Sequence, residues 1–77
     1  MRKEISRYWG DEKVPDREAV VYHNTEKKLY EVDFLSNEKL VETREMVTQY
    51  NDDKGMTVHS MRYAEDAAEN WCLGIIP

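Results

Sequence analysis

Hydrophobic and polar residues alternate with a period of two across the middle of the chain. The stretches AVVYHN and LYEVDFL are rich in β-branched and aromatic residues, and the polar stretch TEKK separates them. A second polar break, SNEK, follows, and the alternation resumes in LVETREMV. Short alternating runs that are bounded by turn residues are typical of antiparallel strands joined by hairpins. The pattern therefore predicts a β-meander between residues 19 and 47.

The sequence predicts a register for the first hairpin. Closing the chain at residues 26–27 places Val21 opposite Val32 and Ala19 opposite Phe34. All four side chains then lie on one face of the sheet, because successive side chains of a strand point to opposite faces. This arrangement favours a sheet that is covered on that face.

The second hairpin follows by the same reasoning, with its turn at residues 37–38. It then pairs four residues of one strand with four of the next: Phe34 with Val41, Asp33 with Glu42, Val32 with Thr43, and Glu31 with Arg44. The pair of opposed carboxylates is mildly destabilising. Contact of this face with a basic protein surface would explain why the sequence keeps two opposed carboxylates, although exposed pairs of this kind cost little.

The two registers together divide the residues between two faces. The predicted core face holds Ala19, Val21, Val32, Phe34, Val41 and Val47, with Tyr30 beside them. The other face holds charged residues at its centre, and further apolar residues: Val20, Tyr22, Leu29, Leu35, Leu40 and Met46. These are ordinary exposed apolar residues or part of a contact surface, as in a homodimer. The candidate partner-binding residues are Glu31, Asp33, Glu42, Arg44, Leu35 and Leu40.

The segments outside the meander are less regular. Residues 1–17 form a poorly ordered or edge segment, in which EISRYWG is either a short helix that ends at Gly10 or a strand with Ile5 and Trp9 on one face. The stretch YNDDKGM predicts a turn, since Asn, Asp and Gly dominate such positions. The stretch MTVHS after it is a candidate fourth strand.

The stretch RYAEDAAENWCLGII has the spacing of an amphipathic helix. Ser60 is a candidate N-cap, and Gly74 sits where a left-handed residue would end the helix, so that Ile75 and Ile76 could fold back onto it. The apolar stripe consists of Met61, Ala64, Ala68, Trp71, Cys72 and Ile75. The residues Glu65, Asp66, Glu69 and Asn70 lie away from it. We interpret the stripe as core and the acids as the solvated side of the helix, rather than as a site.

Length and composition set the class of protein. A chain of 77 residues is one domain with a thin core. With 40% hydrophobic and 35% charged residues it is neither disordered nor a membrane protein. The single cysteine, Cys72, rules out an intramolecular disulfide, which together with the lack of an apolar leader favours the cytoplasm. The predicted fold is α+β: a three- or four-stranded antiparallel β-meander with one C-terminal helix packed on one face.

The charge balance bears on the partner. The formal net charge is −5, and the basic residues near the N-terminus and at Lys27-Lys28 are few and interspersed with acids. Nucleic acids are bound mainly through lysine and arginine contacts to phosphates. We therefore expect no direct nucleic-acid binding and no membrane, but a protein partner with a basic surface.

Motifs for catalysis or metal binding are missing from the sequence. NDDKG suggests an EF-hand loop, but with Gly55 as its sixth residue the twelfth would be Met61, where a glutamate is required. His23, His59 and Cys72 have no metal-ligand spacing, and the glycines form no phosphate-binding loop. We therefore expect no catalytic residue, no metal and no cofactor, and predict that the protein is not an enzyme.

The stretch MRYAEDAAENWCLGII, following YEVDFLSNEKLVETREMV, resembles short uncharacterised reading frames of marine cyanophages. The resemblance covers roughly the last half of the chain, mainly the RYAEDAAENW helix, and brings no activity or site residues with it. It implies a viral protein made in a cyanobacterial host. The leading hypothesis is a small acidic interaction module that binds a host protein. The alternatives are a DNA-mimicking inhibitor of a nucleic-acid-binding protein and, less favoured, a small enzyme or metal protein.

A DNA mimic would need its acids on one continuous surface. The acids in question are Glu31, Asp33, Glu42, Asp52, Asp53, Glu65, Asp66 and Glu69.

Overall fold

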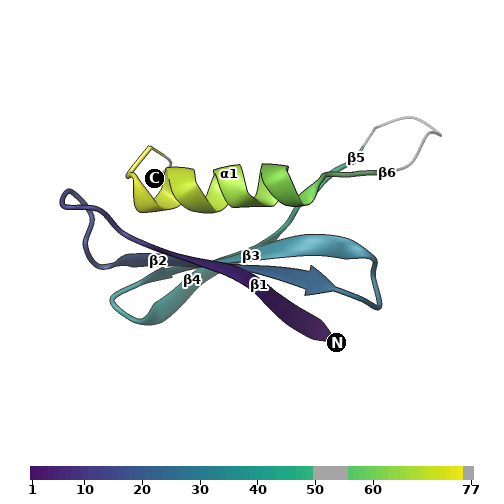
Figure 1. Ribbon diagram of the computed structural model, residues 1–77, viewed down its shortest axis with the longest axis horizontal. Coiled ribbons are helices and arrows are strands. Elements are labelled where there is room, and N and C mark those ends of the chain that lie inside the picture. The colour runs from purple at the N-terminus through teal and green to yellow at the C-terminus, as the bar shows by residue number, and fades with distance from the viewer. Residues whose placement is uncertain (50–55, 76–77) are drawn as a thin grey trace.

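The computed structural model describes residues 1–49 and 56–75, and it confirms the α+β prediction. A four-stranded antiparallel sheet follows the order of the sequence: β1 (Arg2–Trp9), β2 (Arg17–Asn24), β3 (Leu29–Ser36) and β4 (Lys39–Glu45). The helix α1 (Met61–Cys72) lies across one face of this sheet (Figure 1). It packs mainly on β2 and β3 and also touches β1.

The N-terminal segment is an edge strand. β1 pairs with β2 from end to end, so the strand is confirmed and the helix alternative is wrong, although the strict alternation predicted between Ile5 and Trp9 is interrupted at Ile5. The register shifts between Glu4 and Ser6, which leaves Ile5 as the extra residue of a β-bulge. Bulges and charged residues are common on edge strands, where they hinder pairing with other chains.

The β2–β3 hairpin has the predicted register. Ala19 lies opposite Phe34 and Val21 opposite Val32. In the turn, the Oδ1 atom of Asn24 accepts hydrogen bonds from the backbone N–H groups of residues 26 and 27, at 3.1 and 3.0 Å. Asparagine commonly closes turns in this way, so the turn is encoded locally.

The β3–β4 hairpin turns where predicted but its register is different. Asn37 and Glu38 both have positive φ, 53° and 66°, as a two-residue hairpin turn requires. Beyond the pair Leu35–Leu40 the register shifts by one residue, and Val41 is the extra residue of a second bulge. The observed pairs are Phe34 with Glu42, Asp33 with Thr43, Val32 with Arg44, and Glu31 with Glu45.

All four predicted pairings of this hairpin are therefore wrong, because the bulge inverts the faces of β4 after Val41. Val41, predicted in the core, is 58% exposed. Met46, predicted on the opposite face, is 2% exposed and belongs to the core. Val47 is half-buried and begins the next strand.

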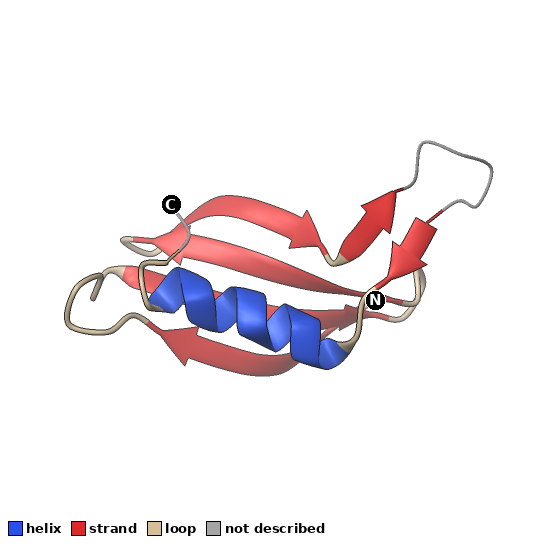
Figure 2. Cartoon of the chain, turned by 90° about the horizontal axis from the view of Figure 1, so that it is seen from above, coloured by secondary structure: helices blue, strands red, loops and turns tan. Residues whose placement is uncertain are grey.

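The stretch after the turn does form a strand, but outside the main sheet. β5 (Val47–Gln49) pairs with β6 (Met56–Val58) in a separate two-stranded ribbon that extends beyond the body of the molecule (Figures 1 and 2). The turn predicted for YNDDKGM lies mostly outside the described residues.

The caps of α1 are those that the sequence predicts. Ser60 is the N-cap, and its hydroxyl accepts the N–H of Tyr63. Gly74 has a φ of +77°, and the N–H of Ile75 donates to the carbonyl of Asn70 at 2.9 Å, which is the pattern of a Schellman motif. The side chain of Ile75 is 66% exposed, so it does not fold back onto the helix, and Ile76 lies outside the described residues.

The core lies between α1 and the sheet. Its buried members are Ala19, Val21, Val32, Phe34, Met46, Ala64, Ala68, Trp71 and Cys72. The helical stripe is thus confirmed as core at four positions, while Met61 at its start is 40% exposed. No helix in the described part of the chain is long and apolar enough to cross a membrane.

Candidate functional site

The face of the sheet opposite α1 carries an ordered network around Arg2. Its Nε atom lies 2.8 Å from Oε1 of Glu31, and its Nη2 atom lies 2.7 Å from Oδ1 of Asp33. The guanidinium stacks on Tyr22, 3.9 Å from the ring centroid, and Thr43 donates to Asp33 at 2.8 Å. These contacts raise the pKa of Arg2, chiefly through the hydrogen bond to Asp33. Two of the predicted partner-binding acids therefore already share one cation within the chain, Arg2.

The other predicted site residues are not gathered with them. Glu42 and Arg44 lie opposite Phe34 and Val32, on the side of β4 that faces α1, and they pair with each other at 2.7 Å. Leu40 pairs with Leu35 across the hairpin and is 58% exposed. The structure thus brings Glu31 and Asp33 together but places the predicted set on two sides of the sheet.

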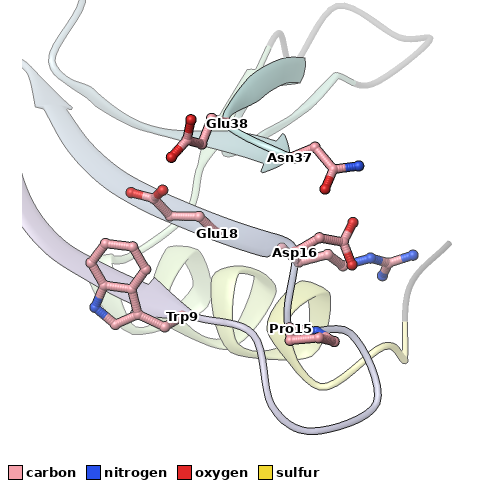
Figure 3. A pocket seen from close by; sticks show the side chains of 7 residues that line it. Trp9, Pro15, Asp16, Glu18, Asn37 and Glu38 are labelled. Atoms are coloured by element: carbon pink, nitrogen blue, oxygen red, sulfur yellow. The ribbon is translucent and has the colours of Figure 1, made fainter.

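A hollow at one end of the open face, beside the exposed Trp9, is a candidate site. It has a volume of about 400 Å³ and lies where the end of β1, the start of β2 and the β3–β4 turn meet (Figure 3). Its lining residues are Trp9, Pro15, Asp16, Arg17, Glu18, Asn37 and Glu38. We refer to it as the Trp9 pocket.

The two loops that build the Trp9 pocket are tied to each other by hydrogen bonds. The hydroxyl of Ser36 donates to Oδ2 of Asp16 at 2.5 Å, and the N–H of Asn37 donates to the carbonyl of Asp16 at 2.9 Å. The N–H of Gly10 donates to the carbonyl of Arg17 at 2.7 Å. A Cβ atom at Gly10 would collide with the carbonyl oxygen of Val14, so only glycine fits there.

Carboxylates dominate the charge of the Trp9 pocket. Asp16, Glu18 and Glu38 line it, and the hydrogen bond from Ser36 lowers the pKa of Asp16 below its usual value. The cation of the lining, Arg17, stacks on Trp71 at 4.0 Å and donates to the carbonyl of that residue at 3.2 Å. The positive charge of Arg17 thus lies at the C-terminus of α1, where a cation is stabilising.

Trp9 stands at the rim of this pocket and is 68% exposed. A guanidinium of the chain itself, that of Arg7, lies 5.8 Å from the Trp9 ring centroid and forms an ion pair with Glu18. The same guanidinium also contacts Glu4 at 2.8 Å. Arg7 does not itself line the pocket, but its guanidinium contacts two of the lining residues, Trp9 and Glu18.

A second, smaller hollow of about 290 Å³ lies between β4 and α1. Its lining residues are Arg44, Met46, Tyr63, Asp66, Ala67 and Asn70.

The thiol of Cys72 is buried, and this burial raises its pKa. Cys72 lines neither of the two hollows. Across residues 1–49 and 56–75, no three His, Cys, Asp or Glu side chains are grouped so as to hold a metal ion.

The acids that a DNA mimic would use are spread over the molecule. Glu31 and Asp33 lie on the open face, whereas Glu65, Asp66 and Glu69 belong to α1 on the other side of the sheet. Glu65 also accepts hydrogen bonds from Ser6 and Tyr8 at 3.2 and 3.3 Å, which ties the helix to β1. Asp52 and Asp53 lie outside the described residues.

No family model, no curated protein and no solved structure matches this chain. The case for a function consequently rests on the geometry of the Trp9 pocket. Sequence reasoning missed this pocket because its residues come from two connections that are distant in the sequence, the β1–β2 loop with its flanking residues and the β3–β4 turn. The one available signal was Trp9 itself, a large aromatic residue directly before a glycine and a polar loop.

Proposed function

We propose that the protein is a small interaction module that binds a basic segment of another protein, and that one cationic side chain of that segment enters the Trp9 pocket. The observation that carries this proposal is the exposure of Trp9, 68%, at the rim of a hollow lined by carboxylates. Tryptophan is enriched among the residues that contribute most to binding at protein interfaces.

The chemistry of the lining selects the ligand. A cation is attracted to the face of an indole ring, and the attraction grows as both groups lose water. Asp16 and Glu38 add negative charge on the opposite side of the hollow from Trp9 (Figure 3). Lysine or arginine fits this combination, whereas an acidic side chain would be repelled.

Arg7 limits the strength of binding. Because its guanidinium pairs with Glu18 beside Trp9, an incoming cation has to share or displace that contact. The net charge of −5 attracts a basic partner over a longer range and raises the rate of association at low salt. If the resemblance to cyanophage reading frames reflects origin, the partner is a host protein in the cytoplasm of a cyanobacterium.

Titration with short peptides tests the proposal. We expect tetra-lysine or tetra-arginine peptides to shift the indole N–H signal of Trp9 in an NMR spectrum. The indole of Trp71, which donates to the carbonyl of Leu35 at 3.1 Å, should not shift and serves as an internal control for the fold. A tetra-glutamate peptide should have no effect on either signal.

Two variants locate the binding. Trp9→Ala should abolish it, and Glu38→Gln should weaken it severalfold, while the charge-matched Glu12→Gln in the exposed part of the β1–β2 loop should not. Arg7→Ala should strengthen it, because the competing guanidinium is gone. Cationic peptides that leave the Trp9 signal unchanged at millimolar concentration would refute the proposal.

A further inference from the structure

One row of side chains crosses the open face at the end that carries the Trp9 pocket. The register of the sheet places its four members beside one another, one from each strand: Trp9, Glu18, Leu35 and Leu40. We refer to these residues as the end row. The bulge at Val41 begins beyond the pair Leu35–Leu40, so it does not disturb the row. Trp9 at one end is 68% exposed, and Leu40 at the other end is 58% exposed.

The neighbouring row of the open face is different in character. It holds two charged side chains, Arg7 and Asp33, and both form ion pairs within the chain. Val20 lies between them and is buried. The end row instead leaves apolar groups exposed at both of its ends, next to the carboxylates of the Trp9 pocket. Exposed apolar groups that gather beside polar ones are typical of a protein-binding surface.

We propose that the basic segment of the partner lies extended along the end row, across the strands, and that an apolar side chain four residues from its cation packs on Leu40. This inference rests on the proposed function, which places the cation beside Trp9. It adds a second contact at the other edge of the sheet, and it defines the partner as a segment with one basic and one apolar residue at a fixed spacing.

The spacing follows from the geometry of the sheet and of an extended segment. Neighbouring strands lie about 4.8 Å apart, so Trp9 and Leu40, which are three strand spacings apart, are separated by about 14 Å. An extended segment advances about 3.3 Å per residue, so four residues span about 13 Å, and their side chains point to the same side. A spacing of two residues covers only about 7 Å, and a spacing of three turns the second side chain away from the sheet.

The surroundings of the end row select the same kind of segment. Glu18 lies between Trp9 and Glu38 along the pocket, so carboxylates accompany the row and repel an acidic segment (Figure 3). Leu35 is half-buried and lies directly beside Leu40, so an apolar side chain of the partner contacts two leucines. Burying about half of a leucine side chain there should raise the affinity by about fivefold.

Capped pentapeptides test the spacing. Lys-Ser-Ser-Ser-Leu and its reverse, Leu-Ser-Ser-Ser-Lys, cover the two directions in which a segment can cross the strands. Lys-Ser-Ser-Leu-Ser moves the leucine by one residue, and Lys-Ser-Ser-Ser-Ser lacks it. We expect at least one of the first two to bind about fivefold more tightly than the leucine-free peptide, as measured from the indole N–H signal of Trp9. The peptide with the moved leucine should lose this gain, and the methyl signals of Leu40 should shift only with the tighter peptide.

Two matched variants locate the second contact. Leu40→Ser should remove the gain in affinity and leave binding of the leucine-free peptide unchanged. Leu73→Ser makes the same change at another exposed leucine, which is the C-cap of α1 on the other side of the sheet, and should keep the gain. The indole N–H signal of Trp71 confirms that both variants are folded.

The outcomes separate this inference from the proposed function. If tetra-lysine shifts the Trp9 signal but leucine adds no affinity in either direction, this inference alone is overturned. A gain that survives in Leu40→Ser also overturns it, since the leucine would then bind elsewhere. If tetra-lysine leaves the Trp9 signal unchanged, both proposals fail. A peptide-free dimer that Leu40→Ser dissociates in sedimentation experiments would show that a second copy covers the end row, and would likewise overturn the inference.

Discussion

The two tryptophans mark the two faces of the sheet and serve opposite purposes. Trp71 is 6% exposed, packs on Phe34 with 5.3 Å between ring centroids, and donates its indole N–H to the carbonyl of Leu35. Trp9 is 68% exposed and stands beside a hollow. The same residue type thus fills the core on the inner side of α1 and stands exposed on the opposite face of the sheet.

The two faces also bury their residues by different means. Under α1 the buried side chains are apolar and pack on one another. On the open face, Val20 is 2% exposed and Glu31 is 6% exposed, although no helix lies above them. Val20 lies opposite Arg7 and Asp33, and the long side chains of this face pair with one another across the strands. The aliphatic parts of these long side chains, held in place by the ion pairs, therefore cover the open face where no second layer of structure does.

The largest expected effect concerns the covered face. Trp71→Ala removes a buried ring, the stacking of Arg17 on that ring, and the hydrogen bond to Leu35. It should lower the unfolding free energy by about 3–5 kcal/mol. Trp9→Ala should change the unfolding free energy by no more than about 0.5 kcal/mol. Chemical denaturation followed by circular dichroism measures both. Equal losses for the two variants would show that the contrast between the faces is wrong.

The next effect tests the bulge in β4. Met46→Ala should cost about 2–4 kcal/mol because Met46 is buried in the core. Val41→Ala should cost less than about 1 kcal/mol because Val41 is exposed. The unbulged register predicted from the sequence requires the reverse order, so the denaturation midpoints of these two variants decide between the registers.

This hairpin also shows how far the sequence determines the fold. The alternation of residues and the turn residues correctly predicted the meander, the β2–β3 register and the helix with its caps, because each depends on neighbours in the chain. The bulge at Val41 could not be predicted from neighbours in the sequence, since the extra residue costs little locally. Whether the bulge forms depends instead on which side chain, Val41 or Met46, fills the core. The Trp9 pocket was missed for a related reason: loops that are distant in sequence create it.

An intermediate effect is expected for the network on the open face. Arg2→Met leaves Glu31, whose side chain is 7% exposed, without its cation and should cost about 1–3 kcal/mol. The double variant Arg2→Met with Glu31→Leu should recover part of this loss, because the buried carboxylate of Glu31 is gone, while Asp33 keeps the hydrogen bond from Thr43. Arg44→Met breaks a comparable bond between half-exposed groups and should cost less than about 1 kcal/mol. A loss for Arg2→Met no larger than for Arg44→Met would mean that the open face is not held by this network.

The smallest effect concerns the Trp9 pocket itself. The pKa of Asp16 is lowered first by the hydrogen bond from Ser36, and Ser36→Ala should therefore raise this pKa toward the ordinary value for aspartate, about 3.9. A carboxyl group whose pKa is lower when folded stabilises the fold above its unfolded pKa, and that contribution disappears as the pH falls through the folded pKa. In Ser36→Ala this contribution should shrink, so stability near neutral pH falls slightly and depends less on pH in acid, and the change is small because Asp16 is exposed.

An NMR titration of the Asp16 side-chain carboxyl carbon between about pH 2 and pH 6 measures this shift of pKa. Ser6→Ala is the matched control, because that hydroxyl donates instead to Glu65 at the edge of the covered face and should leave the Asp16 titration unchanged. If Ser36→Ala leaves the pKa of Asp16 where it was, the tie between the two loops does not set the charge of the pocket. Peptide binding by Ser36→Ala should then decline at the same pH as in the unmodified protein, rather than at the higher pH expected from a raised Asp16 pKa.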